Sequence, residues 1–200
     1  EKEGVLKAQF INASEKLVVE NVRVTDDSIF IPGYIFESEL QAKIIDSNHI
    51  SGVFKKLDTK EIYEIPFEAF GHQAYRIRKN VKKASFDYSG KWEVTFTRES
   101  DTTNAIGLFN QKENNITGKF LTATGDYRYL KGEIDDDKLI LSTFDGAHAF
   151  LFTAVPFEEE KIKGKFYSGK HWEEDWVAVR NDNYELPNPE ELTFLNEGFD

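Results

Sequence analysis

The sequence predicts an all-β protein whose antiparallel strands form an up-and-down meander, closed as a barrel or packed as a sandwich. The first observation is strict alternation of apolar and polar residues, as in the run that sets Trp92, Val94 and Phe96 on one face. A period of two is typical of half-buried antiparallel strands. The second is the presence of turn residues between such runs, at the spacing of about eight to twelve residues that sandwiches and barrels show.

The clearest series of strands lies in the second half of the chain. Ile162 to Phe166 alternates in the same way as the run around Trp92, with lysines on the polar face. Acidic clusters such as Asp135–Asp137 mark the turns, because short polar residues favour tight turns. The sequence predicts eight short strands here, over 91–97, 104–110, 115–122, 126–133, 138–144, 147–154, 161–167 and 173–180.

The two halves of the chain resemble each other. A shift of 110 residues without gaps places Phe10 on Phe120, and a shift of 112 places residues 50–54 on residues 162–166. Any two alternating meanders can match by chance, but the length of the ungapped match favours an internal repeat. In this interpretation the first copy lacks a counterpart of the first two strands of the second copy.

The repeat predicts the division of the chain. We expect a first β unit over residues 1–86, truncated at its start, and a second β unit over residues 87–183. Residues 184–200 contain two prolines, which do not fit a central strand. We therefore expect this tail to be a linker to a C-terminal domain that follows it.

Composition excludes several classes of function. The net charge of −11 disfavours binding to nucleic acid, because lysine and arginine supply the contacts to phosphate. The chain has no cysteine, which excludes a disulfide framework, a cysteine zinc site and a thiol nucleophile. A membrane-spanning helix needs a run of about 18 apolar residues, and no apolar run in this sequence is nearly that long. We therefore expect no membrane-spanning segment.

Two turns carry most of the candidate ligand- or partner-binding residues, and Tyr127 lies in the predicted strand 126–133. One is the Asp-Gly turn that separates Asp145 from His148, and the other begins at His171 in a run of aromatic and acidic residues. Aromatic residues here could form a stacking platform for a flat ligand or could pack in the core. The candidate set is Tyr127, Asp145, His148, His171, Trp172, Glu174 and Trp176.

The same residues give no case for catalysis, a metal or a cofactor. Imidazole and carboxylate together suit divalent metals, but the spacing of these residues matches no metal signature. No run resembles a nucleophile elbow or a phosphate-binding glycine loop. We therefore predict no catalytic residue, no metal site and no cofactor.

Several separated motifs in the second half occur in a characteristic order. They are residues 89–94, 116–122, 124–130, 144–152 and 166–172, followed by Trp176, Arg180-Asn181 and Leu186-Pro187. Together they resemble the region upstream of the thioredoxin-fold domain in bacterial envelope TlpA-like, or peroxiredoxin-like, thiol–disulfide oxidoreductases. The resemblance implies a periplasmic or envelope-anchored lipoprotein context and a redox domain with a Cys-x-x-Cys pair.

The lack of cysteine decides what this resemblance can imply for the chain itself. No redox role carries over to any of its residues. The expected function is that of a non-catalytic accessory domain, which contacts the C-terminal thioredoxin-fold domain or its client proteins.

A second resemblance is to lipocalin-like barrels. Gly90-Lys91-Trp92 at a strand start and Arg180 on the last strand are similar to their Gly-x-Trp motif and closing arginine. This resemblance implies a structural stacking pair between Trp92 and Arg180. It leaves two alternatives open: two duplicated lipocalin-like units as the fold, and a stand-alone binder of a small ligand or glycan as the function.

Overall fold

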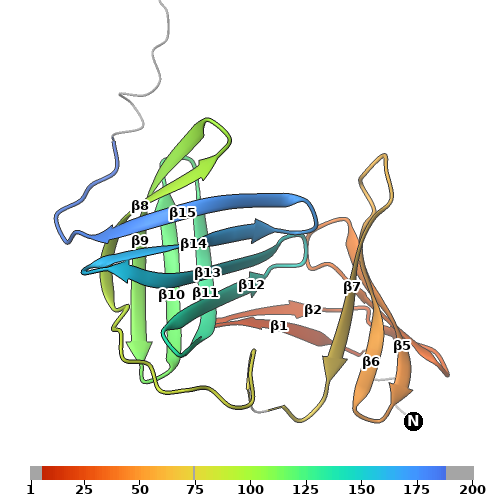
Figure 1. The fold of residues 1–200 in the computed structure, drawn as a ribbon. Coiled ribbons are helices and arrows are strands. Elements are labelled where there is room, and N and C mark those ends of the chain that lie inside the picture. The colour runs from red at the N-terminus through yellow and green to blue at the C-terminus, as the bar shows by residue number, and fades with distance from the viewer. Residues whose placement is uncertain (1–5, 74, 188–200) are drawn as a thin grey trace, which may run out of the picture. The chain divides into compact units, whose positions relative to one another are not determined.

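The computed structural model describes residues 6–73 and 75–187, and these residues contain fifteen strands and no helix. This confirms the predicted all-β, antiparallel fold (Figure 1). The first seven strands are β1 (Ala8–Asn12), β2 (Glu15–Val19), β3 (Arg23–Val24), β4 (Ser28–Pro32), β5 (Ser38–Asp46), β6 (His49–Lys56) and β7 (Tyr63–Phe70). The other eight are β8 (Gly90–Arg98), β9 (Asp101–Lys112), β10 (Asn115–Thr122), β11 (Asp126–Asp135), β12 (Lys138–Phe144), β13 (Ala149–Glu158), β14 (Lys161–Ser168) and β15 (Trp172–Arg180).

Strands β8 to β15 form a closed barrel. Neighbours along the chain pair with each other, and β15 pairs back to β8, for example through Trp176 and Phe96. The eight predicted strands correspond one to one to these eight strands. The largest differences are at the start of β9, three residues earlier at Asp101, and the end of β13, four residues later at Glu158.

Aromatic rings fill the interior of the barrel. Phe152 stacks on Phe166 with ring centroids 4.4 Å apart, and Phe120 lies 4.7 Å from Phe152. Phe96 contacts these three rings and those of Tyr127 and Trp176, at centroid distances between 5.3 and 6.3 Å. Such packing is typical of small eight-stranded barrels, whose interior has just enough room for side chains.

Trp92 and Arg180 form the structural pair that the sequence predicted. The guanidinium carbon of Arg180 lies 4.4 Å from the Trp92 ring centroid. The same guanidinium donates hydrogen bonds to the backbone oxygens of Asp87, at 2.7 Å, and Ser89. The pair therefore joins the last strand of the barrel to the segment that leads into its first strand.

The first half of the chain forms two open sheets. Strands β1 and β2 make a hairpin, and β3 to β7 form a five-stranded sheet in chain order. The chain divides into two compact units, and the first contains the residues up to 80 together with Ser142–Leu151 and Tyr167–Trp172. The predicted boundary at residues 86 and 87 separates β7 from β8, but two hairpin tips of the second stretch also belong to the first unit. The predicted tail 184–200 lies outside the described residues, apart from 184–187.

The hairpins β1–β2 and β10–β11 agree with the predicted internal repeat. In the first hairpin Phe10 is opposite Leu17, and in the second Phe120 is opposite Tyr127. Both residues of the second pair lie 110 positions after those of the first. A shift of 110 residues therefore relates both residues of the first pair to those of the second, and the two pairs have the same cross-strand pairing.

Strands β6 and β14 show the repeat in the packing of the backbone. Gly52 and Gly164 lie 112 residues apart, and a Cβ atom on either would lie within 2 Å of a carbonyl oxygen of the neighbouring strand. Those oxygens belong to Gln41 and Thr153, which are again 112 residues apart. Only glycine allows such a close approach. The shared contact supports a duplication.

The two halves that the predicted repeat relates differ in closure. Within the described residues, the first copy has no counterpart of β8 and β9, the two strands that complete the barrel in the second copy. Its sheets therefore have free edges. The alternative of two closed lipocalin-like units is not what this part of the chain forms.

Candidate functional site

The turn between β12 and β13 holds Asp145 and His148 against each other. One carboxylate oxygen of Asp145 accepts hydrogen bonds from the backbone N–H groups of Ala147, at 2.8 Å, and His148, at 2.7 Å. The other carboxylate oxygen lies 2.9 Å from Nδ1 of the His148 ring. A short acidic side chain that caps the backbone two and three residues later is a common way to fix a tight turn.

The surroundings of Asp145 keep its carboxylate ionised, and this decides which ring nitrogen of His148 carries a proton. Burial raises the pKa of Asp145, but the hydrogen bonds from the His148 ring and from the two backbone N–H groups outweigh it, so the pKa lies below its usual value. An ionised carboxylate only accepts hydrogen bonds. Nδ1 of His148 therefore carries the proton, and Nε2 remains for an external partner.

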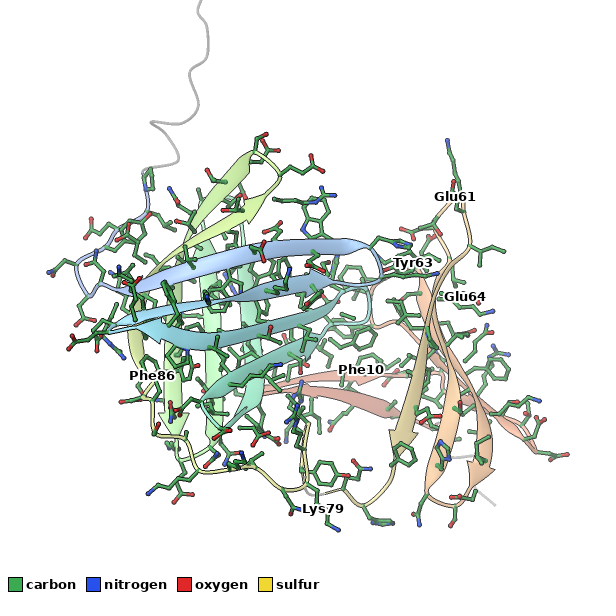
Figure 2. All side chains as sticks on the ribbon, viewed as in Figure 1. Phe10, Glu61, Tyr63, Glu64, Lys79 and Phe86 are labelled. Carbon is green, nitrogen blue, oxygen red and sulfur yellow. The ribbon has the colours of Figure 1, made fainter. Side chains whose placement is uncertain are left out.

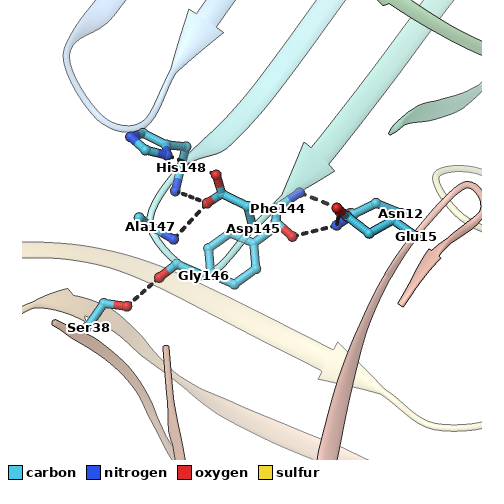
Figure 3. Close-up of polar contacts among 8 residues, drawn as sticks. All are labelled: Asn12, Glu15, Ser38, Phe144, Asp145, Gly146, Ala147 and His148. Carbon is cyan, nitrogen blue, oxygen red and sulfur yellow. Dashed lines mark hydrogen bonds and ion pairs between the residues drawn. The ribbon is translucent and has the colours of Figure 1, made fainter. Parts of the chain in front are cut away.

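The turn is anchored to β1 through Asn12 (Figure 3). The Asn12 side chain accepts a hydrogen bond from the backbone N–H of Phe144 at 3.1 Å and donates one to its carbonyl at 2.7 Å. The Phe144 ring packs edge-on against Phe10 and Phe54, at centroid distances of 5.0 and 5.2 Å. Asn12 is only 2% exposed, so this polar contact is part of the core of the first unit.

A second anchor comes from the start of β5. The buried hydroxyl of Ser38 donates a hydrogen bond to the carbonyl of Gly146, at the tip of the turn (Figure 3). Gly146 has a φ of 100°, a conformation that favours glycine. Beside this contact lies an open pocket of about 270 Å³, lined by Phe36, Glu37, Ser38, Lys56, Asp58, Ala147 and His148.

Exposed apolar residues occupy two loops at this end of the five-stranded sheet. Ile35 is 75% exposed in the β4–β5 loop, and Ile62 is 89% exposed in the β6–β7 loop. The two loops are joined by a hydrogen bond of 2.8 Å from the Leu57 N–H to the Glu37 carbonyl. We call the exposed apolar residues of these loops the apolar loop cluster: Tyr34, Ile35, Phe36, Leu57 and Ile62.

The pocket and the apolar loop cluster share Phe36. Its ring meets the His148 ring edge-on at a centroid distance of 5.8 Å. His148 in turn stacks on Phe150 at 5.4 Å. The arrangement sets a positioned imidazole and several charged groups next to exposed hydrocarbon, which suits recognition of a partner that is partly apolar and partly polar.

His171 and Trp172 follow Gly169 and Lys170, whose backbone N–H groups donate hydrogen bonds to the Ala149 carbonyl, at 2.9 Å, and to the Tyr63 hydroxyl, at 3.2 Å. His171 and Trp172 are both exposed in the described structure, Trp172 by 43%. Among the residues that the structure describes, no hydrogen bond or ion pair joins His171 to Asp145 or His148. The two candidate turns therefore do not combine their histidines into one dyad.

The three other candidate residues lie on barrel strands, Tyr127 on β11 and Glu174 and Trp176 on β15. Trp176 is 1% exposed and contacts Phe96 and Phe120, so it is a core residue and not part of an accessible binding surface. This corrects its grouping with the contact residues, and the reason is that alternation on β15 points it inward. Tyr127 also packs against interior rings, and burial, together with the nearby charge of Glu174, raises its pKa.

Sequence reasoning missed Asn12, Ser38 and Phe36 as parts of the site. Each lies more than 100 residues from the turn that it contacts. Asn12 and Ser38 lie at strand ends and Phe36 lies in a loop, and such positions are too common in a single sequence to indicate a site. Long-range pairing alone brings them to Asp145 and His148.

The described residues show no group of three or more histidine, aspartate or glutamate side chains that could hold a metal ion. Within the same ranges, no helix has the length and apolar character needed to cross a membrane.

No protein-family model, curated protein or solved structure matches the chain.

Proposed function

We propose that this chain is a non-catalytic binding domain that contacts a partner polypeptide through the apolar loop cluster and the pocket beside His148. The observation that carries the proposal is the exposure of Ile35, Leu57 and Ile62 on two loops that a backbone hydrogen bond joins. Large apolar side chains that are exposed together are typical of interaction surfaces.

The pocket adds specificity to this apolar surface. His148 is held by Asp145 and by two ring contacts, so its Nε2 atom loses little freedom when it meets a partner. Lys56 is also held, because its ammonium lies 5.2 Å from the Tyr63 ring centroid. Polar groups beside an apolar anchor are the usual composition of a binding hot spot.

The resemblance to TlpA-like proteins suggests which partner this surface meets. In that context the domain would position the thioredoxin-fold domain or recognise its unfolded clients in the bacterial envelope. The chain itself has no cysteine, so its part in such a protein is contact and not electron transfer. A client with exposed apolar side chains would match the chemistry of the loop cluster.

Binding of a small ligand or glycan is the alternative. The barrel interior is occupied by rings in mutual contact, such as Phe120, Phe152 and Phe166. The pocket of about 270 Å³ beside His148 is a better candidate place for a small molecule. Ligand binding there would raise the melting temperature in proportion to the logarithm of ligand concentration.

The test measures binding of the full chain to a cysteine-alkylated, permanently unfolded polypeptide and, separately, to a TlpA-like thioredoxin domain. The variant Ile35→Ser/Ile62→Ser should weaken binding by about tenfold or more, because it removes two apolar anchors. The matched control Val155→Ser/Val177→Ser changes two exposed apolar residues of the barrel and should bind as the unchanged chain does.

Surface plasmon resonance gives the affinities, and circular dichroism verifies that each variant is folded. Absence of binding to both probes by the unchanged chain would contradict the proposal. Equal loss in the barrel control would show that general hydrophobicity, and not this surface, is responsible.

A further inference from the structure

Among the residues that the structure describes, β7 is an edge strand of the five-stranded sheet. It pairs with β6 over all eight of its residues, and it stands at the end of the strand order. Tyr63 and Glu64 mark its start in Figure 2. Pro66 and the last three residues of the strand are exposed.

The pairing with β6 shows which backbone groups face the open edge. The N–H of Gly71, directly after β7, donates to the carbonyl of Asn48 at the β6 side, at 2.7 Å. Backbone groups alternate in direction along an antiparallel strand. The odd-numbered residues of β7 therefore bond to β6, and the backbone groups of Glu64, Pro66, Glu68 and Phe70 point to the open edge.

The barrel contains the equivalent edge with its partner in place. A shift of 109 residues lays β7 on Trp172–Val179 of β15, and it lays Gly71 on Arg180. The Arg180 N–H donates to the Glu160 carbonyl at 3.0 Å, the counterpart of the bond from Gly71 to Asn48. The next residue, Asn181, donates in the opposite direction, to the carbonyl of Lys91 beside β8.

In the barrel, β8 therefore occupies the edge that β7 leaves open. Val177 pairs with Thr95, and Val179 pairs with Glu93. The residues of β7 that correspond to Val177 and Val179 are Glu68 and Phe70, and in the described structure no strand pairs with them on that side. The large inward residues of β8, Trp92, Val94 and Phe96, are all buried.

We propose that the open edge of β7 binds an extended segment of a partner polypeptide, which adds to the sheet as an antiparallel strand. The segment has the pattern of β8, with large apolar residues at alternate positions. Those residues would lie beside Ile65 and Phe67, which are only half-buried. Main-chain hydrogen bonds supply affinity in this mode of recognition, and the alternate side chains supply specificity.

The sequence of β7 disfavours a second copy of this chain as the occupant. A two-fold axis at Pro66 would place a residue without an N–H at the centre of the pairing. The same arrangement would set Glu64 opposite Glu68, and like charges in directly opposed positions destabilise a pair of strands. Proline and charge on an edge are known devices against self-association.

The test uses the full chain and a labelled peptide with the sequence of residues 89–98, which is β8 with one preceding residue. Fluorescence anisotropy should show saturable binding. Glu68→Pro removes an N–H that faces the open edge and leaves the bonds to β6 intact, so it should weaken binding about fivefold to tenfold. The matched control Glu68→Ala keeps the N–H and should stay within about twofold.

Hydrogen exchange provides a second measurement, since the amides of Glu68 and Phe70 should exchange more slowly when the peptide is bound. If Glu68→Pro fails to fold, Glu64→Pro tests another outward N–H. No saturable binding, or equal binding by the proline and alanine variants, would overturn the proposal. So would equal binding of a scrambled peptide without alternation, or a dimer in light scattering that Glu68→Pro dissociates.

Discussion

The two halves of the chain show what closure of a sheet does to similar strand patterns. In the second copy β8 and β9 complete a barrel, and Phe166 is packed among Phe96, Tyr127 and Phe152. Its counterpart Phe54 has two ring neighbours, Tyr63 and Phe144. In the first copy every residue of β4 is only half-buried. Closure converts alternating faces into a dense core, and an open sheet keeps part of its apolar surface for other contacts.

The largest expected effect compares the two phenylalanines directly. Phe166→Ala should lower the free energy of unfolding by about 4 to 5 kcal/mol, because the cavity it leaves is surrounded by rings that cannot collapse. Phe54→Ala should lower it by about 3 kcal/mol or less, since fewer rings surround it and an open sheet relaxes more readily. Urea unfolding followed by far-ultraviolet circular dichroism measures both.

Equal losses for the two alanine variants would break the comparison, because they would show that closure does not make the second core denser in energetic terms. Phe157→Ala, at an exposed position of β13, is a control that should cost about 1 kcal/mol or less.

A smaller effect concerns Arg180, which has no equivalent in the first copy because Gly71 occupies that position at the 109-residue shift. Arg180→Ala should lower the free energy of unfolding by about 2 to 3 kcal/mol, since it leaves the Asp87 and Ser89 carbonyls without their charged donor. Arg128→Ala removes an exposed pair with Asp126 and should cost less than about 1 kcal/mol.

Thermal unfolding of the two arginine variants checks the difference. Arg180→Lys sharpens it, because lysine keeps the charge but cannot make the forked contacts or stack in the same way. A lysine variant as stable as the unchanged chain would mean that charge alone, and not the Trp92 stack, joins the ends of the barrel sheet.

The smallest effect is the pH dependence that comes from Asp145. Its pKa lies below its usual value in the folded state, so its contribution to stability is present above the unfolded pKa of about 3.9 and is lost as the pH falls through the folded pKa. Asp145→Asn should therefore reduce the loss of stability between about pH 5 and pH 3. His148→Ala should reduce it to a lesser degree, because the two backbone N–H donors remain.

Urea titrations at several pH values in this range give the slope for each chain. A slope that Asp145→Asn leaves unchanged would contradict the assignment of this carboxylate to the acid-sensitive contact in the first unit.

The sequence was sufficient for most of the fold. Alternation around Trp92, Val94 and Phe96 and the intervening turns predicted all eight barrel strands, because a period of two depends only on local residue order. Closure was not readable in the same way. It depends on whether the last strand pairs with the first, as β15 pairs with β8. That pairing joins residues about 80 positions apart in the sequence.

The candidate site could be predicted in part. The Asp-Gly turn placed Asp145 and His148 within reach of each other, and the structure shows their 2.9 Å contact. Trp176 could not be assigned correctly, because an aromatic residue on a strand is equally compatible with a core and with a binding face. Ser38 carried no signal at all, since its contact with Gly146 depends on the folding of distant segments.

The matched glycines have a consequence for how this chain could be rebuilt. Gly52 and Gly164 each approach a carbonyl oxygen of the neighbouring strand, that of Gln41 and that of Thr153. Phe54 lies two residues after Gly52, and Phe166 lies two residues after Gly164. Strands β6 and β14 have equal lengths, and both carry isoleucine at the second position, glycine at the fourth and phenylalanine at the sixth. We therefore expect a recombinant chain that carries either strand twice to retain the close approach between neighbouring strands that the glycine permits.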